Sequence, residues 1–221
     1  MISRLPAPSP TIARVAPFAV FALLTSFQGY GPETAKYWIY AAKTVLGAGL
    51  LWWVWPVAKE MRWTFSWAGL LVGVVIAGLW IGLEPFYPHF GRGGKPWNPF
   101  ADFGERSALA WFFVSVRLLA VTLVVPPLEE VFYRSFLYRY ISKPDFESVP
   151  LKGVRWPAFL ITAALFGAAH PGEWLPGMLC GAAYQALVCW KGRLGDAILA
   201  HAVTNLILGI YVVSSRSFQF W

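Results

Sequence analysis

Apolar residues form eight long runs along the chain, separated by short polar connections. The runs cover 15–27, 37–57, 67–83, 107–125, 128–141, 156–169, 174–190 and 194–213. A helix that crosses a bilayer takes about 20 mostly apolar residues. The pattern therefore predicts an all-α fold: a polytopic membrane helix bundle with about eight transmembrane helices, in one integral membrane domain over 1–221.

Two proline-containing stretches interrupt this pattern. The stretch 84–106 is rich in proline, glycine and charge, which predicts a loop or a re-entrant segment. Pro126 and Pro127 separate the fourth run from the fifth, and proline removes a backbone donor and ends helices. We therefore expect the chain to cross the membrane twice between 107 and 141, with a turn at the two prolines.

Composition narrows the class of protein further. Of 221 residues, 57% are hydrophobic and only 13% are charged, whereas soluble domains carry about 25% charged residues. This excludes a disordered chain and speaks against a soluble enzyme. The net charge of +7 comes from basic residues that lie mostly between the apolar runs, where they contact lipid headgroups. We expect membrane lipids as partners and no nucleic acid.

Charged side chains inside the apolar runs are the first candidate chemistry, because a charge at membrane depth costs about 2.5–3.5 kcal/mol or more. Glu129, Glu130 and Arg134 follow the proline pair. Glu130 and Arg134 are four residues apart on one helical face and are expected to pair. Glu129 then stays free to take a proton, as a general base does. The alternative is a plain ion pair at a helix start, with Glu129 facing headgroups.

Polar residues in the later runs complete the candidate site. His170 ends the run 156–169, and His201 and Asn205 lie four residues apart in the last run. Each could be an interhelical polar contact. Because each is costly in lipid unless the others satisfy it, we expect Glu129, His170, His201 and Asn205 to line one polar cavity, with Glu129 and His170 one water apart. Arg117 should face protein and contact a carboxylate or helix-end carbonyls.

The order of these motifs gives the chain a recognisable signature. Glu-Glu-x-x-x-Arg at 129–134, Phe-x-x-x-His at 166–170 and His-x-x-x-Asn at 201–205 together resemble the CAAX-protease and bacteriocin-processing family. These are intramembrane glutamate endopeptidases, similar to type II CAAX prenyl proteases. The motif-bearing core covers about 107–213. Tyr-Arg-Ser at 133–135 stands where the family usually has Phe-Arg-Gly.

The resemblance implies a metal-independent protease without a cofactor, which hydrolyses a peptide bond in a membrane-anchored or lipidated peptide or protein. It implies that Glu129 and His170 activate the attacking water, and that Glu130 and Arg134 support them. His201 and Asn205 would stabilise the oxyanion of the tetrahedral intermediate.

Other classes of function stay open on the sequence alone. A zinc protease would need metal ligands, but the chain has no His-Glu-x-x-His, and Arg134 would repel a dication. A proton-coupled transporter could use the same buried groups, although no inverted repeat relates the two halves. A non-catalytic scaffold or immunity protein could keep the fold without the activity.

The basic residues also predict topology, since cytoplasmic connections carry more lysine and arginine. The connections 142–155 and 191–193 are cytoplasmic in either arrangement of the segment 107–141. With two crossings in that segment, the N-terminus lies outside and the cavity lies nearer the non-cytoplasmic face, in a bacterial or archaeal plasma membrane. We predict this arrangement.

Overall fold

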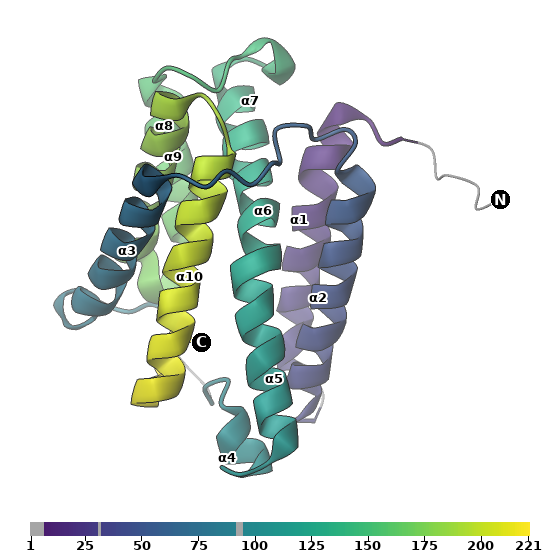
Figure 1. Cartoon of the computed structure of the whole chain (residues 1–221), viewed down its shortest axis with the longest axis vertical. Coiled ribbons are helices and arrows are strands. Elements are labelled where there is room, and N and C mark those ends of the chain that lie inside the picture. Colours follow the sequence, from purple (N-terminus) through teal and green to yellow (C-terminus); the bar gives the residue numbers. More distant parts are fainter. Residues whose placement is uncertain (1–6, 31, 92–94) are drawn as a thin grey trace.

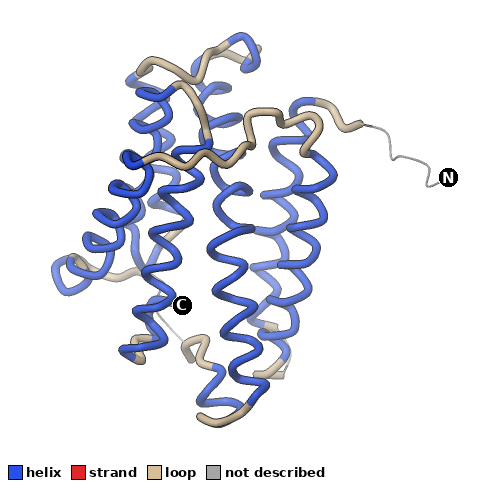
Figure 2. Tube along the Cα trace, viewed as in Figure 1, coloured by secondary structure: helices blue, strands red, loops and turns tan. Residues whose placement is uncertain are grey.

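The computed structural model describes residues 7–30, 32–91 and 95–221, and every regular element within these ranges is a helix (Figure 2). The α-helices are α1 (Pro10–Ser26), α2 (Ala35–Val54), α3 (Trp67–Gly82), the short α4 (Pro99–Phe103), α5 (Ala108–Leu119), α6 (Val125–Glu130), α7 (Tyr138–Ser142), α8 (Trp156–Ala168), α9 (Trp174–Lys191) and α10 (Gly195–Ser215). The prediction of an all-α bundle is confirmed.

Two π-helical turns, Ala120–Val124 and Val131–Leu137, join α5 to α6 and α6 to α7. The segment Ala108–Ser142 is consequently one continuous helix of 35 residues, hereafter the long helix. With the long helix counted once, the ten α segments of the described chain reduce to eight helices.

The long helix overturns the prediction of two crossings between 107 and 141. Pro126 and Pro127 lack the N–H groups that an α-helix directs to carbonyls four residues back, and their rings crowd those carbonyls. Just before them the helix widens, and the N–H of Val125 donates to the carbonyl of Ala120, five residues back. The π turn accommodates the prolines, so the helix continues instead of ending.

Helix length and composition place the chain in a membrane. Among the described residues, the stretches Pro10–Gly29, Ala108–Ser142 and Gly195–Ser215 are long and apolar enough to span a bilayer, and α3 and α8 are shorter apolar helices. Large apolar side chains point outward from these helices, as at Leu71 on α3 and Leu160 on α8. The protein is an integral membrane helix bundle.

The helices pack in neighbouring pairs around the long helix. α8 packs along α9, α3 along α10 and α1 along α2; Figure 1 shows α1 and α2 on one side of the long helix and α10 on the other. Glycine permits the closest of these contacts. A Cβ atom on Gly73 of α3 would lie 2.6 Å from the carbonyl oxygen of Ala200 in α10, so a larger residue there would push the helices apart.

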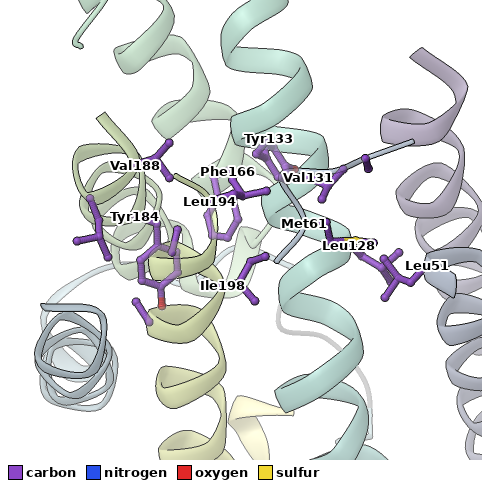
Figure 3. Close-up of a cluster of buried hydrophobic side chains, with 14 of the residues drawn as sticks. Leu51, Met61, Leu128, Val131, Tyr133, Phe166, Tyr184, Val188, Leu194 and Ile198 are labelled. Carbon is purple, nitrogen blue, oxygen red and sulfur yellow. The ribbon is translucent and has the colours of Figure 1, made fainter. Parts of the chain in front are cut away.

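A buried apolar cluster fixes the middle of the long helix against its neighbours (Figure 3). It draws side chains from α2, from the connection before α3, from the long helix and from α8, α9 and α10, among them Leu51, Met61, Leu128, Val131, Tyr133, Phe166, Tyr184, Val188, Leu194 and Ile198. Leu128 and Val131 flank the two adjacent glutamates, so this packing also sets the position of Glu129 and Glu130.

The arrangement of the helix ends corrects the predicted side of the N-terminus. The start of α1, the connection 55–66, the end of α7 and the turn between α9 and α10 lie at one end of the bundle (Figure 1). We call this the α1 end. The short α4 and the end of α10 lie at the opposite end, which we call the α4 end. Because the long helix crosses only once, α1 begins on the same side as 142–155, not opposite to it.

A buried ion-pair network ties α1 to the long helix at the α1 end. Arg14 is 5% exposed and its Nε lies 2.6 Å from Oε1 of Glu60. Ser135 donates its hydroxyl to the same carboxylate, and Arg139 donates to the Ser135 carbonyl at 3.2 Å. Burial opposes ionisation of Glu60, but the hydrogen bonds from Arg14 and Ser135 outweigh it and lower the pKa of this carboxyl.

Candidate active site

A cavity of about 210 Å³ lies inside the bundle and is lined by four of the six residues that the motifs single out. They come from the long helix, from the turn after α8 and from α10: Glu129, His170, His201 and Asn205. The predicted convergence on one cavity is confirmed. Glu130 and Arg134 are completely buried and do not line it.

Glu129 is the carboxylate that the long helix contributes to the cavity wall. Its Oε2 atom is buried and has no hydrogen-bond partner in the described part of the protein. A buried carboxylate oxygen without a partner is costly unless another polar group reaches it. Glu129 is therefore available to a water or to a substrate group in the cavity.

Glu130, in contrast, has both oxygens engaged. Oε2 lies 3.1 Å from Nε of Arg134, as an ion pair without the alignment of a hydrogen bond. Oε1 lies 3.0 Å from Nδ1 of His201. The predicted pairing with Arg134 is confirmed, and the contact with His201 adds a link from the long helix to α10. The two adjacent glutamates thus have different electrostatic surroundings.

Arg134 is held by rings and a backbone carbonyl as well as by Glu130. Its guanidinium lies 4.5 Å from the centre of the Phe166 ring, and Nη2 donates to the carbonyl of Gly181 in α9 at 3.3 Å. The cation–π contact offsets part of the loss of water. Arg134 thereby joins the long helix, α8 and α9 directly behind the cavity.

His170 follows the last turn of α8, where its ring is fixed by its own helix. Nδ1 lies 2.8 Å from the carbonyl oxygen of Phe166. A carbonyl only accepts, so Nδ1 carries the proton in this contact and Nε2 of the neutral ring has a lone pair. The Trp80 ring packs nearly perpendicular to the His170 ring, with 5.8 Å between ring centres. His170 can therefore accept a hydrogen bond at the cavity.

Asn205 reaches across from α10 to the π turn of the long helix. Its Nδ2 donates to the backbone carbonyl of Val121 at 2.8 Å. That carbonyl has no helical donor: the N–H of Val125 is used by Ala120, and Pro126, the next residue along, has none. The carbonyl fixes the Asn205 amide and leaves its second N–H available.

Arg117 is the cavity residue whose contacts the sequence did not predict. It faces protein, as expected, but within the described ranges no ion pair with a carboxylate and no hydrogen bond to a helix-end carbonyl is seen. Its guanidinium instead lies 5.0 Å from the Tyr40 ring, 4.6 Å from the Trp97 ring and 5.2 Å from the Trp221 ring. Only the presence of a charge in an apolar run pointed to it, and nothing in the sequence indicated the three rings.

One further histidine and the two cysteines are not among the six residues that the motifs single out. His89 is held between the backbone carbonyls of Gly172 and Glu84, at 2.7 and 2.9 Å. Cys180 and Cys189 are both buried free thiols. Within the described ranges no group of three or more His, Cys, Asp or Glu side chains is placed to hold a metal ion.

Comparison with known proteins identifies the segment that carries the site. Residues 110–207 match the family described as type II CAAX prenyl endopeptidase Rce1-like, and the matched segment contains all three motifs. No curated protein and no solved structure matches the chain. The matched segment includes most of the long helix, α8, α9 and most of α10, so this part of the chain is similar to type II CAAX prenyl endopeptidases.

Proposed function

We propose that the protein is a metal-independent intramembrane glutamate endopeptidase in which Glu129 and His170 activate a water. The observation that carries this proposal is the contrast between the adjacent carboxylates. Glu130 pairs with Arg134 and contacts His201, whereas Glu129 has an oxygen without a partner among the described residues, at a cavity that His170 also lines. A general base needs a lone pair within reach of its proton donor, and Glu129 and His170 each supply one.

The proposed reaction uses one water, and Glu129 carries its proton to the leaving group. Glu129 takes one proton from a water that also donates to Nε2 of His170, and the resulting hydroxide attacks the carbonyl carbon of the substrate. The oxyanion that forms accepts hydrogen bonds from His201 and Asn205. Glu129 then passes its proton to the leaving nitrogen as the C–N bond breaks. The products are a carboxylic acid and an amine, and transfer of the acid's proton to the amine gives a carboxylate and an ammonium ion.

The oxyanion donors are supported by the contacts behind them. Glu130 lies 3.0 Å from Nδ1 of His201 and fixes the ring. The proposed role requires a proton on Nε2 of His201, because only then can this nitrogen donate. The Val121 carbonyl holds Asn205 with one N–H remaining. Donors fixed in this way supply about 3–4 kcal/mol of transition-state stabilisation each. Arg134 also argues against a bound dication in the mechanism, because its charge lies beside the nearest carboxylate.

The substrate that suits this site is a membrane-anchored or lipidated peptide or protein. The cavity lies within a membrane domain that we take to extend over 1–221, with its functional core at about 107–213. By the positive-inside rule the α1 end, which holds the larger share of basic residues, lies in the cytoplasm of a bacterial or archaeal cell. A non-catalytic scaffold and a proton-coupled transporter are the alternative functions, and the experiment must distinguish both from a protease.

The test compares wild-type protein with Glu129→Gln, which keeps the size of the side chain but removes its base. Both are reconstituted in liposomes and incubated with a library of fluorescent palmitoylated and farnesylated peptides, and products are read by mass spectrometry. We expect cleavage by the wild type, a loss of at least about 100-fold in the variant, and no effect of a zinc chelator. Equal cleavage by the variant, or no cleavage by either, contradicts the proposal.

A further inference from the structure

A second, wider cavity of about 710 Å³ adjoins the first, and the two share several lining residues. The shared residues are Arg117, His170, Glu173 and Trp221. The wider cavity extends to Gln28 and Lys36 near the start of α2 and to Lys95 before α4, so it leads toward the α4 end. A substrate that enters from this end passes Arg117 before it reaches Glu129.

Arg117 stands at this junction as a cation without a counter-ion in the described structure. Three aromatic rings surround it, and its Nε is buried without a hydrogen-bond partner among the described residues. Rings offset the charge, but they leave the planar fork of N–H donors unsatisfied. That fork matches a carboxylate, which accepts two parallel hydrogen bonds.

The three lysines of the described chain at or near the wider cavity already have partners. Lys43 donates to Oγ1 of Thr25 at 2.7 Å and to Oε1 of Gln28 at 2.8 Å. Lys36 and Lys95 lie 3.3 and 2.6 Å from the carboxylate of Asp102. Among the described residues, these lysines are therefore less available to an incoming carboxylate than Arg117.

The π turn aligns Arg117 with the proposed base. Arg117, Val121, Val125 and Glu129 follow one another at four-residue intervals, and all four line the first cavity. In a pure α-helix such a row turns by about 40° at each step. The π turn takes more residues per turn, which keeps the row on one face. Arg117 and Glu129 are then about 18 Å apart along the helix axis, the length of about five extended residues.

We propose that Arg117 is a specificity residue that binds a carboxylate of the substrate, about five residues from the bond that is cut. The inference rests on the proposed protease function and adds a recognition site to it. The carboxylate is either the C-terminal α-carboxylate of the peptide or an acidic side chain near that end. Both would make the same two-pronged contact with the guanidinium.

Binding to the Glu129→Gln variant tests this without requiring cleavage. The probes are three fluorescein-labelled peptides, each with a palmitoylated cysteine and five further residues. One ends in a free acid, one in an amide, and one in an amide with glutamate as its last residue. We expect the free acid to bind about tenfold more tightly than the plain amide, and the preference to disappear in Glu129→Gln/Arg117→Gln. Tight binding of the glutamate amide identifies a side-chain carboxylate.

A matched control separates recognition from folding. Arg106→Gln makes the same change at an exposed arginine at the α4 end and should leave the preference intact. Arg117→Lys keeps the positive charge but loses the two parallel N–H donors. It should therefore retain an about threefold preference for the free acid over the plain amide. In the protein with Glu129 intact, Arg117→Gln should raise KM for the acid peptide and leave kcat unchanged. Equal binding of all three peptides by Glu129→Gln overturns the inference, even where wild-type cleavage upholds the protease.

Discussion

The side chain of Asn205 donates a hydrogen bond to the backbone carbonyl of Val121, with 2.8 Å between nitrogen and oxygen. A carbonyl in the middle of a helix is normally occupied by the helix itself. Here the π turn and the proline at 126 remove its donors. An apparent defect in the long helix thus positions a residue of α10 at the proposed oxyanion site.

Pro126→Ala should therefore lower activity without unfolding the protein. Alanine supplies an N–H that competes with Asn205 for the freed carbonyls. We expect kcat to fall by at least about tenfold, with KM unchanged and thermal stability equal or higher, because loss of one oxyanion donor lowers kcat by about 100-fold or more. Steady-state kinetics beside Asn205→Ala provides the comparison. Unchanged kcat in Pro126→Ala together with a large loss in Asn205→Ala would contradict the link between them.

Arg134 and Glu129 should give opposite responses to substitution. Arg134→Ala leaves the buried Glu130 carboxylate with His201 alone and should destabilise the fold by about 3–5 kcal/mol. Glu129→Gln removes a charge from the cavity and should leave the unfolding temperature equal or higher while activity is lost. Thermal unfolding in detergent, followed by tryptophan fluorescence, measures both. Wild-type stability in Arg134→Ala would refute the structural role assigned to that residue.

The pH dependence of stability should reveal the ion pair between Arg14 and Glu60. Because the pKa of Glu60 is lower in the folded protein than its ordinary value of about 4.3, its stabilising contribution is complete above that ordinary value. It is lost as the pH falls through the lower folded value. Glu60→Gln should flatten the acid limb of a plot of unfolding temperature against pH.

Glu147→Gln is the matched control for this experiment. Glu147 also approaches Arg14, at 3.6 Å, but its side chain is half exposed, so the same substitution should leave the acid limb almost unchanged. An identical effect of both substitutions would show that Glu60 has no special contribution.

Membrane orientation can be measured by cysteine labelling in intact cells. Ser9 and Ser148 both lie at the α1 end, and Ser215 at the end of α10, and all three are exposed. By the positive-inside rule, an impermeant maleimide should label Ser215→Cys and spare Ser9→Cys and Ser148→Cys. The native thiols at 180 and 189 are buried and give little background. Labelling of Ser9→Cys would reverse the assigned orientation.

Periodicity in the sequence was sufficient to predict the helices and one contact of the site. The apolar runs agree with α2, α3, α9 and α10 to within a few residues, and the four-residue spacing predicted the pair of Glu130 with Arg134. Both follow from rules local to a single helix. The free-energy cost of polar groups in lipid predicted which side chains would line one cavity.

Features that depend on several helices at once could not be predicted in this way. Proline at 126 and 127 predicts a helix end unless a π turn accommodates the two rings. The prediction of two crossings was therefore wrong, and it also placed the N-terminus on the wrong side relative to 142–155. Three rings from distant segments surround Arg117, and no spacing encodes such a contact. The link from Glu130 to His201 joins positions 71 residues apart, so only the tertiary structure reveals it.

The two partners of Glu130 become available at different moments of synthesis. Arg134 lies one turn away in the same helix, so the pair can form as soon as this segment enters the bilayer, and each charge shields the other from lipid. His201 arrives only with α10, which emerges from the ribosome later. The nascent protein can therefore integrate its charged helix early, whereas the proposed oxyanion site is complete only after α10 inserts. A partly assembled chain is consequently not expected to cleave its neighbours at the translocon.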